Sequence, residues 1–148
     1  MGSWGDFEAA APQLAAFARE RLHGRVAYLA TVQADGGPRV HPVTPIVGGG
    51  RMFVFMEPTS PKGRDLQRDG RYALHCGVED NAGGAGEVAV YGSADLASAP
   101  EQRALAVASS SYAPAERYIL FELRVGTVQT VIYEGEGLRR ERWRAEGQ

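Results

Sequence analysis

The sequence predicts a mainly β domain of the α+β class, an antiparallel barrel of six or seven strands with about three flanking helices. Three observations carry this prediction. The strand-like segments come in consecutive runs, glycine-rich turns join several of them, and they do not alternate regularly with helices. A Rossmann fold is disfavoured, because no Gly-x-Gly-x-x-Gly motif follows a predicted strand.

The composition limits the size and the class of the protein. The chain has 148 residues, 44% of them hydrophobic, and a net charge of −2. This length suits one core, so we expect a single domain over residues 1–148, with a helical segment over 1–24, a barrel core over 25–134 and a C-terminal strand and tail over 135–148. The net charge argues against a nucleic-acid partner, whose binding proteins usually have a basic balance.

The single cysteine and the N-terminal sequence indicate a compartment. Cys76 has no intrachain disulfide partner, which fits a reducing cytoplasm. We find no signal-peptide pattern and no apolar run of ~18 residues, so we expect a cytoplasmic protein without a membrane partner. Cys76 lies in an apolar segment and is expected to be an inert core residue.

Helical patterns occur in three parts of the chain. Ser3 and Asp6 have the spacing of a capping box, and apolar residues then recur at helical spacing as far as Leu22. Pro12 interrupts this pattern and predicts a short turn followed by a longer helix. Two further helices are expected over residues 61–69 and 100–112, each with a proline in its first turn.

Seven segments have the β-branched, aromatic and roughly alternating pattern of strands. They cover residues 25–33, 39–47, 51–56, 71–78, 87–98, 118–133 and 138–144. Glycine turns join the first three, which predicts an antiparallel meander. Gly92 predicts a bulge or a close backbone approach, and Gly126 is expected to bend the longest strand. Residues 79–86 are expected to form a mobile loop.

The helix over residues 61–69 has the features of an anion site. Ser60 is the predicted N-cap and Pro61 the first helical residue, and Lys62 and Arg64 follow in the first turn. Cations at a helix N-terminus oppose the helix dipole, and a bound phosphate would reverse that conflict. The alternative is a solvated surface helix.

The segment from Pro38 to Pro45 predicts an edge strand or an interrupted strand. Pro42 and Pro45 cannot donate to a ladder, and Arg39 and His41 share one face of the strand. Free backbone groups on such a strand can meet a flat ligand. The alternative is an ordinary irregular edge strand.

The C-terminal stretch LRRERWR permits three interpretations. It is a basic and aromatic surface for nucleic acid, a last strand with solvated arginines, or a segment whose Trp143 and a neighbouring arginine reach a ligand across a dimer interface. The three histidines lie on different predicted elements and do not predict a metal site. No residue pattern identifies a catalytic acid, base or nucleophile.

Taken in order, these segments resemble the pyridoxamine 5′-phosphate oxidase-like family of FMN-binding split barrels. The matching stretches are VAYLATVQADGGPRVHPV, RMFVFM and TSPKGRDLQRDGRYALH, with SWGDFEAAAPQLA at the start and RWR at the end. The resemblance covers nearly the whole chain. It implies a split barrel, a homodimer with cofactor at the subunit interface, and either FMN or the F420-type deazaflavin as cofactor.

The resemblance also implies a set of cofactor-binding residues. Arg39, Val40, His41 and Pro42 match the strand along the isoalloxazine ring, Phe55 and Met56 match the strand end near the ring or ribityl chain, and Ser60 and Lys62 match the phosphate binders, with Gly63 and Arg64 beside them. Trp143 and Arg144 match residues that a second subunit contributes.

Two departures from the family pattern narrow the expected function. Pro61 stands where the phosphate motif has its central arginine, so Arg64 replaces that contact or the site is weaker. The C-terminal Arg-x-His substrate motif is not found, so oxidation of vitamin B6 is not expected. We therefore expect a flavin-dependent oxidoreductase that transfers hydride to or from a small organic substrate. The alternative is a non-catalytic flavin- or haem-binding protein of the same fold.

Overall fold

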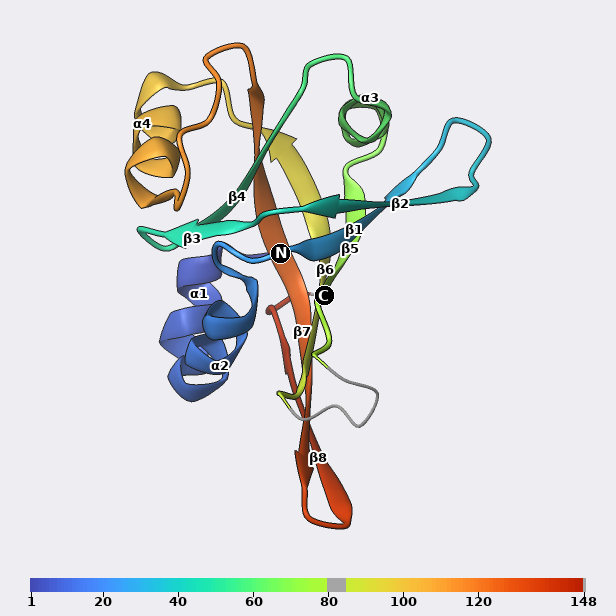
Figure 1. The fold of residues 1–148 in the computed structure, drawn as a ribbon, viewed down its shortest axis with the longest axis vertical. Helices are drawn as coiled ribbons and strands as arrows, with labels where there is room; N and C mark the ends of the chain where they lie inside the picture. The colour runs from blue at the N-terminus through green and yellow to red at the C-terminus, as the bar shows by residue number, and fades with distance from the viewer. Residues whose placement is uncertain (80–84, 148) are drawn as a thin grey trace.

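The computed structural model describes residues 1–79 and 85–147, which contain four helices and eight strands (Figure 1). The helices are α1 (Trp4–Ala10), α2 (Pro12–Leu22), α3 (Pro61–Arg68) and α4 (Pro100–Ser109). The strands are β1 (Ala27–Val32), β2 (Pro38–Val43), β3 (Ile46–Gly48), β4 (Arg51–Met56), β5 (Arg71–Cys76), β6 (Glu87–Leu96), β7 (Ile119–Glu134) and β8 (Gly137–Arg144). Residues 80–84 of the loop expected over 79–86 lie outside the described part.

All the strand pairs in this part of the chain are antiparallel. The strands follow the order β2-β1-β5-β6-β7-β4-β3, and β8 pairs with β7. Within the described residues this path ends at β2 on one side and at β3 on the other, so the sheet is not closed. The predicted fold class, a mainly β split barrel with flanking helices, is confirmed.

Prolines explain why there are more elements than expected. Ala11 ends α1 and Pro12 begins α2, so the expected turn is a seven-residue helix of its own. Thr44 and Pro45 divide the segment over residues 39–47 into β2 and β3, which form opposite edges of the sheet. The predicted meander is therefore wrong, because β1–β2 and β3–β4 are separate hairpins.

The two glycines singled out in the sequence meet at one bulge. Tyr91 pairs with Thr127 and Gly92 pairs with Val125, so Gly126 is the extra residue in β7. A side chain at position 92 would place its Cβ 1.9 Å from the carbonyl oxygen of Arg124. This close approach confirms the prediction for Gly92, and the bulge allows the sixteen-residue β7 to continue through the bend.

Two apolar clusters hold the helices against the sheet. The larger one joins α1 and α2 to the inner faces of most strands, and Trp4 and Phe7 are completely enclosed in it. The smaller one lies between α4 and the β3, β4 and β7 strands. Figure 1 shows α3 apart from the other helices, beside the β1–β2 hairpin. No helix in the described residues is long and apolar enough to span a bilayer.

Candidate cofactor site

The start of α3 is capped as the sequence predicts, but its capping uses most of the free amides. The Gly63 amide donates to Ser60 Oγ at 3.2 Å, and the Arg64 amide donates to the Ser60 carbonyl oxygen at 3.2 Å. Pro61 has no amide hydrogen. Within the described residues, the Lys62 amide is therefore the first-turn donor left without a partner. The helix offers an anion one backbone donor rather than several.

Lys62 and Arg64 carry positive charge at this same helix end. Neither side chain has an acidic partner in the described part of the chain. Burial lowers the pKa of Lys62, because its ammonium group loses part of its hydration without gaining a carboxylate. The Lys62 side chain, the Lys62 amide and the positive end of the helix dipole suit a phosphate. Arg64 follows two residues later and therefore lies on a different side of the helix.

Asp65 connects α3 to the neighbouring hairpin. Its Oδ2 accepts hydrogen bonds from Thr31 Oγ1 and from Arg39 Nε, both at 2.7 Å, and its Oδ1 accepts one from Arg68 Nη2 at 3.1 Å. The residue is only 3% exposed. Burial alone would raise the pKa of Asp65, but the hydrogen bonds from Arg39, Thr31 and Arg68 outweigh it and hold this pKa below the ordinary value.

Sequence reasoning placed Asp65 in the family motif but gave it no role. The available signal is its position between Arg64 and Arg68 in a helix whose other charged side chains are all cations. Nothing in the sequence connects it to Thr31 or Arg39, which are 34 and 26 residues away along the chain. Only the fold brings them together.

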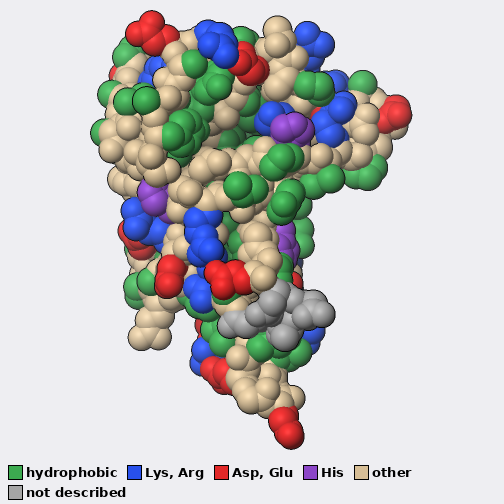
Figure 2. Space-filling view, in the orientation of Figure 1, with side chains coloured by type: hydrophobic (Ala, Val, Ile, Leu, Met, Phe, Trp, Pro, Cys, Tyr) green, Lys and Arg blue, Asp and Glu red, His purple; other side chains and the backbone are tan. Residues whose placement is uncertain are grey.

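A polar cavity of about 380 Å³ separates α3 from the β1–β2 hairpin. It is lined by Gln33, Ala34, Asp35, Arg39, Pro61, Arg64, Asp65 and Arg68. Figure 2 shows basic side chains and a histidine gathered over α3 and β2. The cavity joins Arg39 to Arg64, whereas Ser60, Lys62 and Gly63 are not among its lining residues.

The β2 strand presents its four predicted site residues on two different faces. Arg39 lies on the face toward α3, and His41 shares that face because it is two residues further along the strand. Val40 and Pro42 lie on the opposite face. His41 is exposed, and its Nδ1 lies 2.9 Å from the Pro42 carbonyl oxygen, an acceptor to which a protonated Nδ1 donates. Its Nε2 has no hydrogen-bond partner among residues 1–79 and 85–147.

Phe55 and Met56 end β4 just before the α3 cap, and their side chains go to opposite sides. Phe55 packs in the smaller apolar cluster, with the Arg103 guanidinium 5.1 Å from its ring centre. Met56 packs in the larger cluster. A Cβ at Gly63 would lie 3.1 Å from Met56 Sδ, so Gly63 lets the helix start sit closely on β4.

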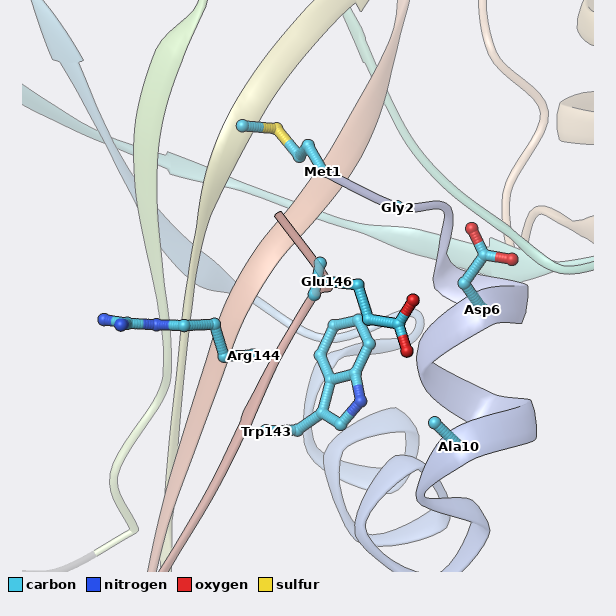
Figure 3. A pocket seen from close by; sticks show the side chains of 8 residues that line it. Met1, Gly2, Asp6, Ala10, Trp143, Arg144 and Glu146 are labelled. Atoms are coloured by element: carbon cyan, nitrogen blue, oxygen red, sulfur yellow. The ribbon is translucent and has the colours of Figure 1, made fainter. Parts of the chain in front are cut away.

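Trp143 and Arg144 are not joined to these residues within one chain. They line a separate cavity of about 430 Å³ with Met1, Gly2, Asp6, Ala10, Ala145 and Glu146 (Figure 3). The Trp143 ring packs on Phe7 with their ring centres 5.1 Å apart, whereas Arg144 extends away on the other side of β8. Figure 1 places α3 and the β7–β8 hairpin at opposite ends of the molecule.

The remaining candidates have structural roles. Cys76 is buried, and burial raises the pKa of its thiol, so it is inert as expected. His23 Nδ1 accepts a hydrogen bond from the Val47 amide at 2.9 Å. Within residues 1–79 and 85–147 no three His, Cys, Asp or Glu side chains are grouped to hold a metal ion.

Comparison with known proteins identifies the family. The model of the pyridoxamine 5′-phosphate oxidase family matches residues 12–132. The chain therefore belongs to that family, with a split-barrel fold. No curated protein matches the chain.

Solved structures of low sequence identity share this fold. A haem-binding protein from Mycobacterium smegmatis has a TM-score of 0.68 and 22% identity over 87% of this chain. The chain spans only 56% of that protein. A pyridoxamine 5′-phosphate oxidase-related FMN-binding protein from Nostoc punctiforme has a TM-score of 0.66 and 14% identity, covering 95% of this chain and 91% of its own. An F420 reductase has a TM-score of 0.57 and 18% identity, covering 74% and 94%.

Proposed function

We propose that the protein binds FMN and acts as a flavin-dependent oxidoreductase on a small organic substrate. The observation that carries this proposal is the pair of cations at the start of α3, Lys62 and Arg64, which have no acidic partner in the described part of the chain. A phosphate is the group that such a helix end recognises. Membership of the family supplies the flavin as the group attached to that phosphate.

In this proposal the chain binds and orients the cofactor. Lys62 and Arg64 hold the phosphate, with the Lys62 amide as a backbone donor. The edge strand β2 runs along the ring over residues Arg39–Pro42, with Arg39 and His41 on the face toward α3. The end of β4 at Phe55 and Met56, whose side chains pack in the two apolar clusters, borders the ring or the ribityl chain with its backbone. Bound flavin supplies the hydride chemistry, at a position that the protein sets. The F420-type deazaflavin also carries a phosphate and is the alternative cofactor.

A second copy of the chain completes the site. Val40, Ala30, Ala73 and Tyr91 lie directly opposite one another across four strands, and they form a continuous apolar row on the outer face of the sheet. Val40 is 67% exposed and Tyr91 44%. Apolar rows of this kind mark protein interfaces. We propose that this face packs against its equivalent in a homodimer.

Arg144 fits a contact across that interface better than Trp143 does. Thr127 pairs with Tyr91 on one side and with Arg144 on the other, so Arg144 extends the same outer row. Trp143 faces inward against Phe7. Both residues of the second copy remain proposed contacts, with Arg144 as the one free to turn toward a neighbour.

Cofactor titration of the apo protein tests this function. FMN should bind with quenched fluorescence, and the complex should then be reduced by a chemical or nicotinamide donor and reoxidised by an acceptor. Sedimentation should give a dimer of the 15.9 kDa chain, and Val40→Glu should shift it to monomer. If neither FMN nor the deazaflavin binds, the proposal is wrong.

Haem binding without catalysis is the second candidate. It is favoured by His41, whose exposed Nε2 is open to an axial bond, and by the haem-binding structural neighbour. A haem titration with a Soret shift that His41→Ala removes would favour it over the flavin. FMN binding that is unchanged by an excess of haem would favour the flavin.

A further inference from the structure

We propose that Asp65 is a positioning residue that holds the ring strand β2 and the phosphate helix α3 in one fixed arrangement. This inference rests on the proposed FMN site, and it changes the role of Arg39. On this view Arg39 serves the cofactor through Asp65, by fixing where α3 lies, and Lys62 and Arg64 remain as the cations that meet the phosphate.

The contacts of Asp65 join three elements. Thr31 reaches it from β1, Arg39 from β2, and Arg68 from the next turn of α3 itself. Arg68 also donates to the Val32 carbonyl oxygen at 2.6 Å, and Arg39 donates to Gln33 Oε1 at 3.3 Å. Both arginines therefore connect the helix with the hairpin, and Asp65 is the carboxylate that they share.

The helix has few other means of keeping its position. It has eight residues, too few to be stable alone, and its buried side chains are Leu66 and Asp65. Beyond its C-terminal end, the Gly70 carbonyl oxygen accepts a hydrogen bond from the Ala94 amide. Leu66 provides non-directional apolar contact, whereas the hydrogen bonds of Asp65 fix the helix along and about its axis.

The charge of Asp65 and its positioning role predict opposite effects on FMN affinity when the carboxylate is removed. Asp65 is a negative charge in the same short helix as the phosphate site, so removing this charge should strengthen the binding of an anion. If Asp65 positions the helix, its removal should instead weaken binding. The sign of the effect therefore separates the two roles.

The positioning role also predicts which ligands are affected. FMN spans the ring strand and the phosphate helix, so its affinity depends on the relative placement of the two. Riboflavin needs only the ring strand, and inorganic phosphate needs only the helix. A ligand with two linked binding groups gains affinity only while both of its sites are held at the matching separation.

The test measures the affinity of FMN, riboflavin and inorganic phosphate for the wild type and for Asp65→Asn. We expect FMN affinity to fall by about tenfold or more, because its two linked binding groups lose their matching separation, while the other two affinities change by less than about threefold. Thr31→Val removes one of the three contacts at nearly constant volume and should give the same pattern with a smaller loss. Asp65→Glu should recover part of the FMN affinity.

Glu122→Gln is the matched control. Glu122 is also 3% exposed, and it pairs with an arginine, Arg51, at 2.9 Å, but it joins β7 to β4 away from α3. The Glu122→Gln variant should have a lower free energy of unfolding without a selective loss of FMN affinity. Equal or tighter FMN binding by Asp65→Asn, an equal loss for all three ligands, or the same selective loss in Glu122→Gln would overturn the positioning role.

Amide hydrogen exchange of the apo protein separates this inference from the proposed function. Asp65→Asn should increase exchange in α3 and β2 and leave β6 and β7 protected. If the wild type binds no FMN, the proposed function fails. Unchanged exchange in α3 of Asp65→Asn would then contradict the positioning role as well. Faster exchange confined to α3 and β2 would support it even in that case.

Discussion

Two regions of the molecule contain side chains that can recognise a flavin phosphate or ring: the α3–β2 region, with Lys62 and Arg64, and the α1–β8 region, with Trp143. They differ in whether these side chains already have a partner within the chain. At α3, Lys62 and Arg64 have no acidic partner in the part of the chain that the structure describes. At α1, the Trp143 ring already packs on Phe7. A charged group that has no partner within the chain indicates a ligand site, whereas the type of residue alone does not.

Trp143→Ala should produce the largest change in stability. The substitution removes a large ring from the surface of Phe7, and we expect the free energy of unfolding of the apo protein to fall by about 2–3 kcal/mol, less than for a fully buried aromatic residue. Urea denaturation measures it. Arg144→Ala, on the other side of the strand, is the control and should stay within about 0.5 kcal/mol of wild type. Similar losses in both variants would contradict the packing role of Trp143.

Lys62→Ala should have opposite effects on binding and on stability. FMN affinity should fall by about 1–3 kcal/mol, the value of a lost charge-assisted hydrogen bond. The apo protein should become more stable by a few tenths of a kcal/mol, because a cation no longer opposes the helix dipole. Calorimetric titration and urea denaturation measure the two. Riboflavin is the matched ligand, since without a phosphate its affinity should hardly change; an equal loss for riboflavin would place the phosphate elsewhere.

Local signals in the sequence predict the fold well. Ser3, Pro12, Ser60 and Gly92 act through backbone geometry that is nearly independent of distant residues, and the structure has caps, a helix boundary and a bulge at those positions. The pairing of β2 and β3 with their neighbours is not local, and the predicted meander fails there.

The candidate site shows the same division between local features, which the sequence predicts, and contacts between distant residues, which it does not. The N-cap and the cations of α3 are contiguous in sequence, so their grouping could be predicted. The contacts of Asp65 with Thr31 and Arg39, and the packing of Trp143 on Phe7, join residues from distant parts of the chain. Alternation along a strand identifies the residues that share a face, but it does not identify the element that covers that face.

Acid should affect the two regions differently. The pKa of Asp65 is lowered in the folded state, so its contribution to stability is present above its ordinary value, near 3.8, and is lost as the pH falls through the lower, folded-state pKa. The difference in unfolding free energy between wild type and Asp65→Asn should therefore shrink from pH 5 towards pH 2. The difference for Trp143→Ala should stay constant, because apolar packing does not titrate. Urea denaturation at a series of pH values measures both, and a constant difference for Asp65→Asn would contradict the assigned pKa direction.

Arg144→Ala should give the smallest effect, and it shows whether the two regions meet across a dimer. An exposed cation of this kind contributes about 0.2–1 kcal/mol to FMN affinity.

The Arg144→Ala variant is mixed with Lys62→Ala to form heterodimers, which are isolated by two affinity tags. If Arg144 acts on the neighbouring copy, one site of the heterodimer combines Lys62 and Arg144 from the two unchanged positions and binds FMN with wild-type affinity, while the other site carries both defects. If Arg144 acts within its own chain, each site carries one defect and no site reaches the wild-type value. A titration without a wild-type step would therefore contradict a contact of Arg144 across the dimer.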